Sequence, residues 1–165
     1  MKLLILSDSH GNRTHLRRAL ELEKPQVVFH LGDGRADILA VMADLPEVPL
    51  YSVPGNCDWR CRLAPVQQVT VEGLPILVAH GHTFGVKSGY QSYLAYGRRQ
   101  GARLLLSGHT HVPCVWEDEG IMLVNPGSVG NGQHPTYAVL EVEQGTVKDC
   151  QIKQIADPVY EWQTL

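Results

Sequence analysis

Two histidines separated by a single residue stand out in the sequence. His109 and His111 lie in "LLLSGHTHVP", directly after an apolar run and beside Gly108. In an extended backbone, residues i and i+2 point to the same side, so both imidazoles can be aimed into one site. Asp8 and His10 in "SDSHGN" have the same spacing. Imidazole and carboxylate groups paired in this way are typical ligands of transition-metal ions.

Groups of the same chemistry follow the other apolar runs of the sequence. Asp33 occurs in "LGDG", Asn56 and Asp58 occur in "PGNCD", and His80 and His82 occur in "HGH". Taken singly, an aspartate or asparagine after a strand is more often a helix cap or a turn residue. A lone histidine at such a place is more often a hydrogen-bonded core residue. The recurrence of these groups at successive run ends, each beside a glycine or small residue, favours one shared site.

The three remaining histidines lack this setting. His15 lies in an Arg-rich, helix-like segment, His30 lies inside an apolar run, and His134 lies in a polar loop. We predict a structural role for all three.

The elements that must position these groups follow from the hydropathy pattern. Short apolar runs at 2–7, 26–31 and 49–53 alternate with helix-like segments at 13–23 and 36–45. This alternation predicts a βαβαβ unit with a parallel sheet, because strands buried on both faces are continuously apolar. In open α/β sheets, ligands bind beyond the carboxyl ends of the strands, where the polar groups listed above are expected.

The second half of the chain is richer in strand-like segments. The strand-like segments occupy residues 67–73, 75–81, 102–108, 113–117, 121–125, 136–143 and 146–155. One helix-like segment occupies residues 88–101. Tight turns at 119–120 and 144–145 favour an antiparallel second sheet. Because no internal repeat or linker is visible, we expect a single domain over residues 1–165, with two sheets and helices outside them.

The composition limits the class of protein. The chain has 165 residues, of which 44% are hydrophobic and 19% charged, with a net charge of −3. It therefore lacks the basic excess that attracts nucleic acid non-specifically. The apolar stretch near the N-terminus is too short for a signal peptide and no stretch has transmembrane length, so we expect a cytoplasmic protein without membrane contact. Four cysteines without a CxxC pair are expected to be reduced.

The set of candidate ligands indicates which metal would bind. Carboxylate, imidazole and amide oxygen without thiolate suit Mn, Fe, Zn, Ni or Co better than a structural zinc finger. Seven such groups exceed the needs of one tetrahedral ion, so we predict two ions that share one carboxylate. Asp33, which follows a central strand, is the predicted bridge.

The order of these motifs resembles that of the calcineurin-like metallophosphoesterase superfamily. The motifs D-x-H, G-D, G-N-x-D, H-G-H and G-H-x-H occur in this order over residues 7–111, as "DSH", "GD", "GNCD", "HGH" and "GHTH". The short chain, "GNCD" and "NPGSVG" at 125–130 are more similar to the small bacterial and archaeal phosphodiesterase branch. The resemblance implies a four-layer α/β/β/α sandwich of two mixed β-sheets flanked by helices.

The resemblance also implies an activity and a ligand set. It implies a divalent-metal-dependent phosphoesterase, most similar to the phosphodiesterases, in which a hydroxide bridging two ions attacks a small phosphate ester. The expected ions are two Mn, with Ni, Fe, Zn or Co as alternatives. By motif, the ligands of one ion would be Asp8, His10, Asp33 and His111, and those of the other Asp33, Asn56, His80 and His109.

Charge counting gives an expectation about the substrate. Two divalent cations, offset by two carboxylates and one hydroxide, leave a net charge of about +1 at the site. This charge matches the single negative charge of a phosphodiester. Arg35 or Arg60 could add positive charge for a monoester, and helix N-termini could help to bind phosphate in either case.

The chain departs from the family pattern at Cys57. Many members of the family carry histidine at this position, where it can contact the leaving group. Without that histidine, His82 or a metal-bound water would donate the proton to the leaving group. The alternative to a catalytic role for Cys57 is that of a small buried residue in a tight turn. Asp58 is expected to orient a ligand imidazole through its second nitrogen, with an Asx turn as the alternative. We count His82, Asp58 and Asn56 as candidate catalytic residues.

Two functions of other classes stay open. One is a non-catalytic scaffold or protein-interaction module of the same fold, like the retromer subunit that this branch resembles. Such a scaffold would be expected to have lost ligands, whereas every ligand position is filled here. The other is a metal-binding or sensor protein without turnover. Self-association into a homo-oligomer also stays open.

Overall fold

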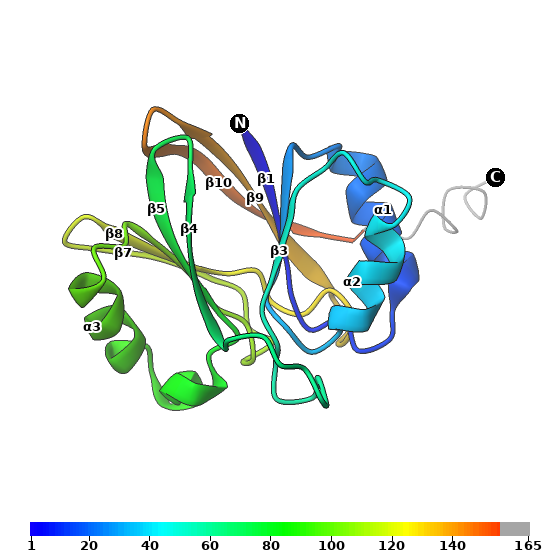
Figure 1. Cartoon of the computed structure of the whole chain (residues 1–165), viewed down its shortest axis with the longest axis horizontal. Coiled ribbons are helices and arrows are strands. Elements are labelled where there is room, and N and C mark those ends of the chain that lie inside the picture. The colour runs from blue at the N-terminus through cyan, green and yellow to red at the C-terminus, as the bar shows by residue number, and fades with distance from the viewer. Residues whose placement is uncertain (156–165) are drawn as a thin grey trace.

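Two five-stranded sheets lie face to face in the computed structural model, which describes residues 1–155 (Figure 1). The first sheet has the order β10-β9-β1-β2-β3 and consists of β1 (Lys2–Leu6), β2 (Val27–His30), β3 (Leu50–Ser52), β9 (Thr136–Glu143) and β10 (Thr146–Gln154). The second sheet has the order β4-β5-β6-β8-β7 and consists of β4 (Val66–Val71), β5 (Leu74–Ala79), β6 (Leu104–Leu106), β7 (Cys114–Asp118) and β8 (Ile121–Asn125).

Helices cover the outer face of each sheet (Figure 1). The first sheet is covered by α1 (Arg13–Glu23) and α2 (Arg35–Met42), and the second by α3 (Gln91–Arg99). Two short 3₁₀ helices, η1 (His82–Phe84) and η2 (Val86–Ser88), lie between β5 and α3. The resulting layers confirm the predicted α/β/β/α sandwich with two mixed sheets.

Apolar side chains on both faces of the central strands form the core. Along β1, Leu3 and Ile5 point between the two sheets, where they pack with residues such as Val78 of β5. Leu4 and Leu6 point to the opposite face and pack beneath α1 and α2. This burial on both faces explains why β1 is continuously apolar.

The pairing of the strands differs from the prediction in one respect. The chain forms the expected parallel β1–β2–β3 unit, and tight turns with positive φ at 119–120 and 144–145 close the expected hairpins. The prediction of a separate antiparallel second sheet was wrong, because β9 and β10 join the first sheet beside β1. In the second sheet, β5, β6 and β8 are parallel. A hairpin sequence fixes its own turn but not the sheet edge to which the hairpin attaches.

Two further expectations concern the whole chain. No helix within residues 1–155 is long and apolar enough to cross a membrane. A single domain over residues 1–165 stays a prediction, and residues 156–165 lie outside the described part.

A buried carboxylate ties α1 to three strands of the first sheet, β1, β9 and β10. Glu23 accepts hydrogen bonds from Lys2 Nζ at 2.9 Å, from Lys153 Nζ at 2.9 Å and from Tyr137 Oη at 2.8 Å. Burial raises the pKa of Glu23, but these hydrogen bonds outweigh burial, and the net pKa lies below its ordinary value. The ionised form of Glu23 therefore stabilises the folded state.

We expect Glu23→Gln to lower the free energy of unfolding by about 1–3 kcal/mol at pH 7, because the hydrogen bonds lose their charge. The pKa of Glu23 is depressed by folding, so its contribution is present above the unfolded-state pKa and is lost as pH falls through the folded-state pKa. Urea denaturation should therefore show a smaller difference between variant and wild type at acidic pH. Glu21→Gln, an exposed change on the same helix, is the control. A difference that does not shrink at acidic pH would contradict this assignment.

Candidate metal centre

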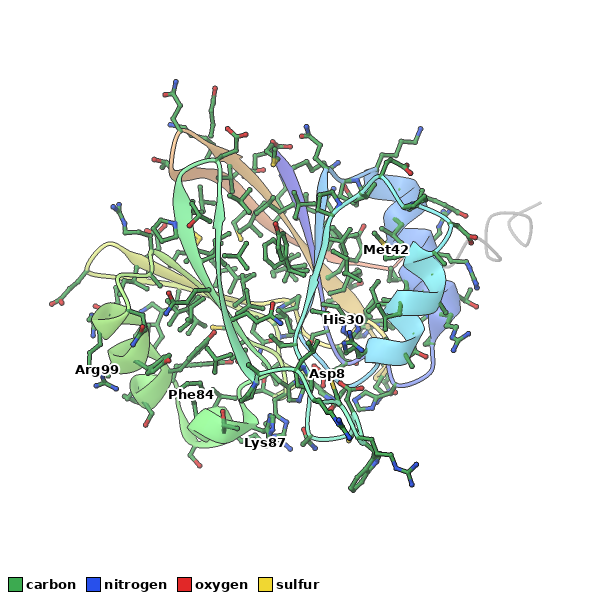
Figure 2. All side chains as sticks on the ribbon, viewed as in Figure 1. Asp8, His30, Met42, Phe84, Lys87 and Arg99 are labelled. Atoms are coloured by element: carbon green, nitrogen blue, oxygen red, sulfur yellow. The ribbon has the colours of Figure 1, made fainter. Side chains whose placement is uncertain are left out.

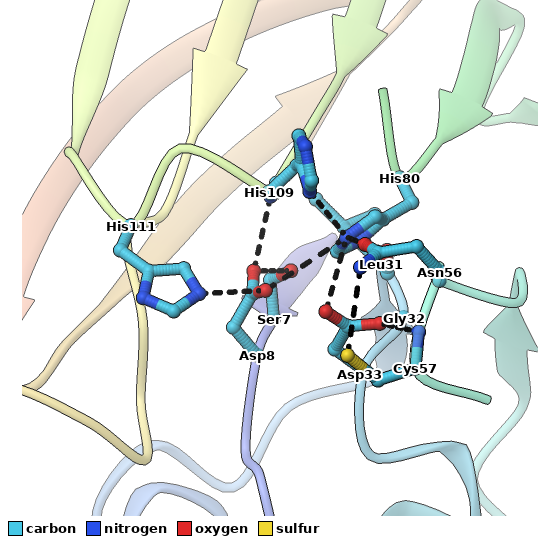
Figure 3. Close-up of polar contacts among 12 residues, drawn as sticks. Ser7, Asp8, Leu31, Gly32, Asp33, Asn56, Cys57, His80, His109 and His111 are labelled. Atoms are coloured by element: carbon cyan, nitrogen blue, oxygen red, sulfur yellow. Dashed lines mark hydrogen bonds and ion pairs between the residues drawn. The ribbon is translucent and has the colours of Figure 1, made fainter. Parts of the chain in front are cut away.

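Loops at the carboxyl ends of five strands carry the predicted metal ligands (Figure 3). They follow the strands in chain order: Asp8 and His10 after β1, Asp33 after β2, Asn56 after β3, His80 after β5, and His109 and His111 after β6. Both sheets thus contribute loops to one edge of the molecule, where Asp8 is seen in Figure 2. This is the edge at which open α/β sheets bind ligands.

The backbone of these loops is strained. Five of the seven predicted ligands have left-handed φ angles: Asp8 56°, His10 44°, Asp33 56°, His109 72° and His111 61°. We predicted from an extended backbone that the two residues of each i, i+2 pair point into one site. The backbone at these pairs is therefore not extended. Such conformations cost of the order of 1–3 kcal/mol each and persist where the surroundings hold them. Here they direct the two histidines after β6 to different neighbours.

Backbone hydrogen bonds join neighbouring ligand loops. The Asp8 N–H donates to Gly32 O at 2.9 Å, and the His10 N–H donates to Asp33 O at 3.1 Å. The loops approach so closely at Gly55 that an added Cβ would lie 2.5 Å from Asp33 N. Only glycine fits at this position without a shift of the ligand loop.

One group of ligand atoms consists of Asp8, His10 and His111. The Nε2 atoms of the two histidines lie 3.3 Å apart. Asp8 Oδ1 lies 3.1 Å from His111 Nε2 and 3.5 Å from His10 Nε2. The second oxygen of Asp8 accepts hydrogen bonds from Ser7 Oγ and from the His109 N–H. The orientation of Asp8 is therefore fixed by a hydroxyl and a backbone N–H, neither of which is a proposed ligand atom.

A second group surrounds the fully buried His80. Its Nε2 lies 3.0 Å from Asn56 Oδ1, 3.1 Å from His109 Nδ1 and 3.4 Å from Asp33 Oδ2. The other ring nitrogen, Nδ1, lies 2.7 Å from the carbonyl oxygen of Leu31. Because a carbonyl only accepts, Nδ1 carries a proton, and neutral His80 then presents the lone pair of Nε2 to the site.

These distances test whether the residues fit a metal ion. With His80 neutral, an imidazole lone pair, a carboxylate oxygen and an amide oxygen face one another, an arrangement that a cation among them stabilises, whether a metal ion or a proton on Nε2. Ligand atoms of Asp8, His10 and His111 lie within 4.8 Å of one another, and so do those of Asp33, His80 and His109. Asp33 Oδ2 also lies 3.8 Å from His10 Nε2, so this carboxylate reaches both groups. The residues fit divalent cations.

The electrostatics of the site favour an ionised Asp33. Burial raises the pKa of Asp33, but hydrogen bonds from His80 and from the Cys57 N–H outweigh burial, so the pKa lies well below its ordinary value. Burial and the neighbouring His80 lower the pKa of His109. Both shifts favour the unprotonated forms that bind metal.

Asp58 forms different hydrogen bonds from those predicted. Its carboxylate accepts hydrogen bonds from the backbone N–H groups of Asp33, Gly34, Arg35 and Gly55, at 2.8, 3.0, 3.1 and 2.8 Å. Among the described residues it has no hydrogen bond to an imidazole, so the prediction that Asp58 orients one was wrong. Nor is the contact a local turn, because three of the donors lie in the loop after β2. Asp58 holds the backbone of the Asp33 loop instead.

Cys57 is exposed and faces the ligands, so the alternative of a buried turn residue was also wrong. Its Sγ lies within 4.8 Å of ligand atoms of His10 and Asp33. Its backbone N–H donates to Asp33 Oδ1 at 2.7 Å. Partial desolvation by the surrounding loops and the neighbouring Asp33 carboxylate raise the pKa of the thiol, which favours the protonated form. This thiol is not among the ligands predicted from the sequence, although its neighbour Asn56 is.

His82 lies beside the second ligand group. Its ring centroid is 5.4 Å from that of His80 and 6.0 Å from that of His109. The Nδ1 atom is buried and has no hydrogen-bond partner among the described residues. Burial and His80 lower the pKa of His82, which disfavours the protonated form that a proton donor requires.

The predicted phosphate-binding groups differ in their surroundings. At the start of α2, the N–H groups of Gly34 and Arg35 donate to Asp58. The N–H of Gly11, two residues before α1, donates to Asp37 at 2.8 Å. Protein carboxylates therefore occupy these three amides, which are not free to bind phosphate. Arg60 is exposed, whereas the Nε of Arg35 is buried without a partner among the described residues.

The three histidines assigned structural roles lie outside both ligand groups. His30 is fully buried, its Nε2 lies 3.1 Å from Ser9 Oγ, and burial lowers its pKa to about 4. The Nδ1 of His15 lies 2.7 Å from Val129 O. His134 is exposed.

Comparisons with known proteins agree on one family. The model of the calcineurin-like phosphoesterase superfamily domain matches residues 1–145. The "Probable metallophosphoesterase" of Mycoplasma pneumoniae is 28% identical, over 90% of this chain and 94% of that protein. The "Phosphodiesterase YfcE" of Escherichia coli K12 is 32% identical, over 86% of this chain and 88% of that protein.

A comparison of folds finds the same architecture in a protein with a different name. A crystal structure of Vps29 from Entamoeba histolytica, complexed with Zn²⁺, superposes with a TM-score of 0.74. The match covers 94% of this chain and all of that one, at 20% identity. At this identity the likeness concerns the fold alone.

Proposed function

The chain belongs to the calcineurin-like phosphoesterase superfamily, and from this premise we propose that it is a divalent-metal-dependent phosphodiesterase with a dinuclear centre. One observation carries the proposal. The metal-ligating atoms of the ligand loops converge in two groups, and Asp33 reaches both groups. An enzyme that uses two ions needs such a shared carboxylate.

The residues that would hold the two ions divide as the two groups do. Asp8, His10, Asp33 and His111 would hold one ion. The other would be held by Asp33, Asn56, His80 and His109. The hard and borderline ligands suit Mn²⁺ best, with Ni, Fe, Zn or Co as alternatives. When bound, two divalent ions would activate water and neutralise charge on the phosphoryl oxygens.

The protein's own residues orient the site and set its charge. Asp8 and Asp33 are the two carboxylates among the seven proposed ligands, so two divalent ions would leave the site positive and attract a monoanionic diester. Asp58 fixes the loop of Asp33 through four backbone N–H groups. His82 lies beside the site with a lowered pKa, so we propose that it binds a phosphoryl or leaving-group oxygen as a neutral imidazole. Asn56 would orient substrate as well as bind metal.

A scaffold function is the second candidate, because the fold matches that of Vps29. The filled ligand set argues for the enzyme, since a scaffold has no need of five strained ligand backbones around a dinuclear site. Binding of metal without turnover of any phosphate ester would favour a scaffold or sensor.

A screen of substrates against metals tests the proposal. The purified protein is loaded separately with Mn²⁺, Ni²⁺, Fe²⁺, Zn²⁺ and Co²⁺ and assayed on small phosphomonoesters and phosphodiesters. We expect hydrolysis that depends on the metal and is faster with diesters. Faster hydrolysis of monoesters would overturn the substrate class, and the absence of turnover with every metal would overturn the enzyme.

Changes at Cys57 test the origin of the leaving group's proton. Cys57→Ala is expected to leave the rate on an aryl diester nearly unchanged, because the backbone N–H that holds Asp33 remains. Cys57→His is expected to speed hydrolysis of an alkyl diester, whose alkoxide needs a proton, since general acids contribute about 10²–10⁴-fold. Initial rates on both esters give the comparison.

The opposite pattern would change the mechanism. A more than about tenfold loss in Cys57→Ala on the aryl diester, with both ions still bound, would make the thiol part of the chemistry.

A further inference from the structure

We infer that the loop "NPGSVG" at 125–130 holds the ligand loops after β1 and β6 in their strained conformations, with Asn125 and Ser128 as positioning residues for metal binding. The inference rests on the proposed function, because it concerns the affinity of the same centre. No side chain of this loop belongs to the proposed ligand set. Its contacts nevertheless reach both loops.

Asn125, at the end of β8, holds the loop after β6. Its side chain is fully buried, and its Oδ1 accepts a hydrogen bond from the Gly127 N–H at 2.9 Å. This bond fixes which end of the amide is oxygen, so Nδ2 faces Gly108 O at 3.1 Å and Thr110 Oγ1 at 2.9 Å. These two residues flank His109, and Thr110 also precedes the second histidine of the loop. One amide thus holds the backbone carbonyl before a proposed ligand and the side chain of the residue after it.

Ser128 holds the loop after β1. Its Oγ donates to the carbonyl oxygen of Asp8 at 2.8 Å. The same carbonyl accepts a hydrogen bond from the Gly130 N–H at 3.3 Å, and the Val129 N–H donates to Ser7 O at 3.0 Å. Three donors from one short segment therefore fix the peptide units on both sides of Asp8.

Close packing reinforces these hydrogen bonds at Gly130. A Cβ added there would lie 1.9 Å from the backbone oxygen of Ser9. Ser9 lies between Asp8 and His10, so the segment presses directly on the strained backbone of both ligands. Glycine is required at this contact.

The strain explains why such a support is needed. Asp8, His10, His109 and His111 all have left-handed φ angles. Residues of this kind return to ordinary conformations unless hydrogen bonds and packing over-determine them. Buried hydrogen bonds such as those of Asn125 are stronger than exposed ones, because the surroundings have a low dielectric constant. Removal of the Asn125 amide would let the loop relax and turn its two histidines away.

The test measures metal affinity in variants outside the ligand set. Metal-free wild type, Asn125→Ala and Ser128→Ala are titrated with Mn²⁺ by calorimetry, and the visible spectrum of bound Co²⁺ reports the ligand geometry. We expect both variants to bind Mn²⁺ about 10–100-fold more weakly and to change the Co²⁺ spectrum. Thr136→Val is the matched control, since the buried Thr136 Oγ1 donates to Pro126 O at 2.7 Å in the same loop. Its affinity and spectrum should match wild type.

Each outcome bears on the inference. Unchanged affinity and spectrum in folded Asn125→Ala and Ser128→Ala would overturn it. An equal loss in Thr136→Val would also overturn it, because any loosening of the loop would then have the same effect. If Asn125→Ala fails to fold, Ser128→Ala still tests the support of the loop after β1. Asn125→Asp then tests the support of the loop after β6. Wild type that binds no divalent metal would overturn the proposed function as well, whereas binding without an effect of the variants overturns this inference alone.

Discussion

Asp33→Asn is expected to reduce kcat/KM for a phosphodiester by about a thousandfold or more, because a lost bridging charge removes several kcal/mol of transition-state stabilisation. Asp33 reaches both ligand groups, with Oδ2 3.4 Å from His80 Nε2 and 3.8 Å from His10 Nε2. Asparagine keeps the acceptor for the Cys57 N–H, so the turn should survive. Steady-state kinetics with excess metal give the measurement, and circular dichroism confirms folding.

Two histidine variants serve as comparisons for the loss of activity in Asp33→Asn. His82→Ala is expected to lose about tenfold, because a neutral imidazole beside the site contributes one hydrogen bond in the transition state. His134→Ala, an exposed change outside both ligand groups, should have the wild-type rate. Equal losses in Asp33→Asn and His82→Ala would mean that His82 is itself a ligand or that the bridge is assigned to the wrong residue.

Removal of the metal is expected to abolish hydrolysis and to lower the melting temperature. The proposed ligands present lone pairs to one another, so the folded state gains when a cation separates them. At a free metal concentration about 100 times the Kd, binding stabilises the folded state by about 2.7 kcal/mol. Dialysis against a chelator followed by re-addition of Mn²⁺, with assays and thermal melts at each step, measures both effects.

The pH dependence of this loss has a defined sign. Burial lowers the pKa of His80, but Asp33 and Asp8 outweigh burial and raise it above the ordinary value. A proton therefore competes with the metal for Nε2, and the affinity for Mn²⁺ should fall as pH decreases. Full activity in a chelated sample that elemental analysis shows to be metal-free would contradict the metal dependence.

Local patterns in the sequence predicted many elements at the right residues. The helix at 13–23 and the strand at 136–143 were predicted at the positions that the structure gives, because apolar spacing and flanking polar residues mark both. The edge where the candidate ligands gather was also predictable, since parallel strands place their carboxyl ends together. These features depend on residues that are near one another in the chain.

Contacts between residues far apart in the chain could not be predicted from local sequence patterns. The role of Asp58 depends on the amides of a loop more than twenty residues earlier, at 33–35. The sheet that β9 joins depends on pairing with β1, across most of the chain. The left-handed backbone at Asp8 and His109 depends on the surrounding loops, because this conformation is uncommon even for aspartate and histidine, which adopt it more readily than most residues. Motif order still identified the candidate ligands that gather at this edge, because it does not depend on backbone conformation.

The number of ions bound per chain tests the central proposal most directly. The protein is loaded with Mn²⁺, freed of unbound metal, and measured by elemental analysis together with a crystal structure. We predict two ions per chain that share Asp33, with His80 and His109 bound to one and His10 and His111 bound to the other. A single tetrahedral ion with His80 pointing away from it would contradict the dinuclear centre and the mechanism built on it.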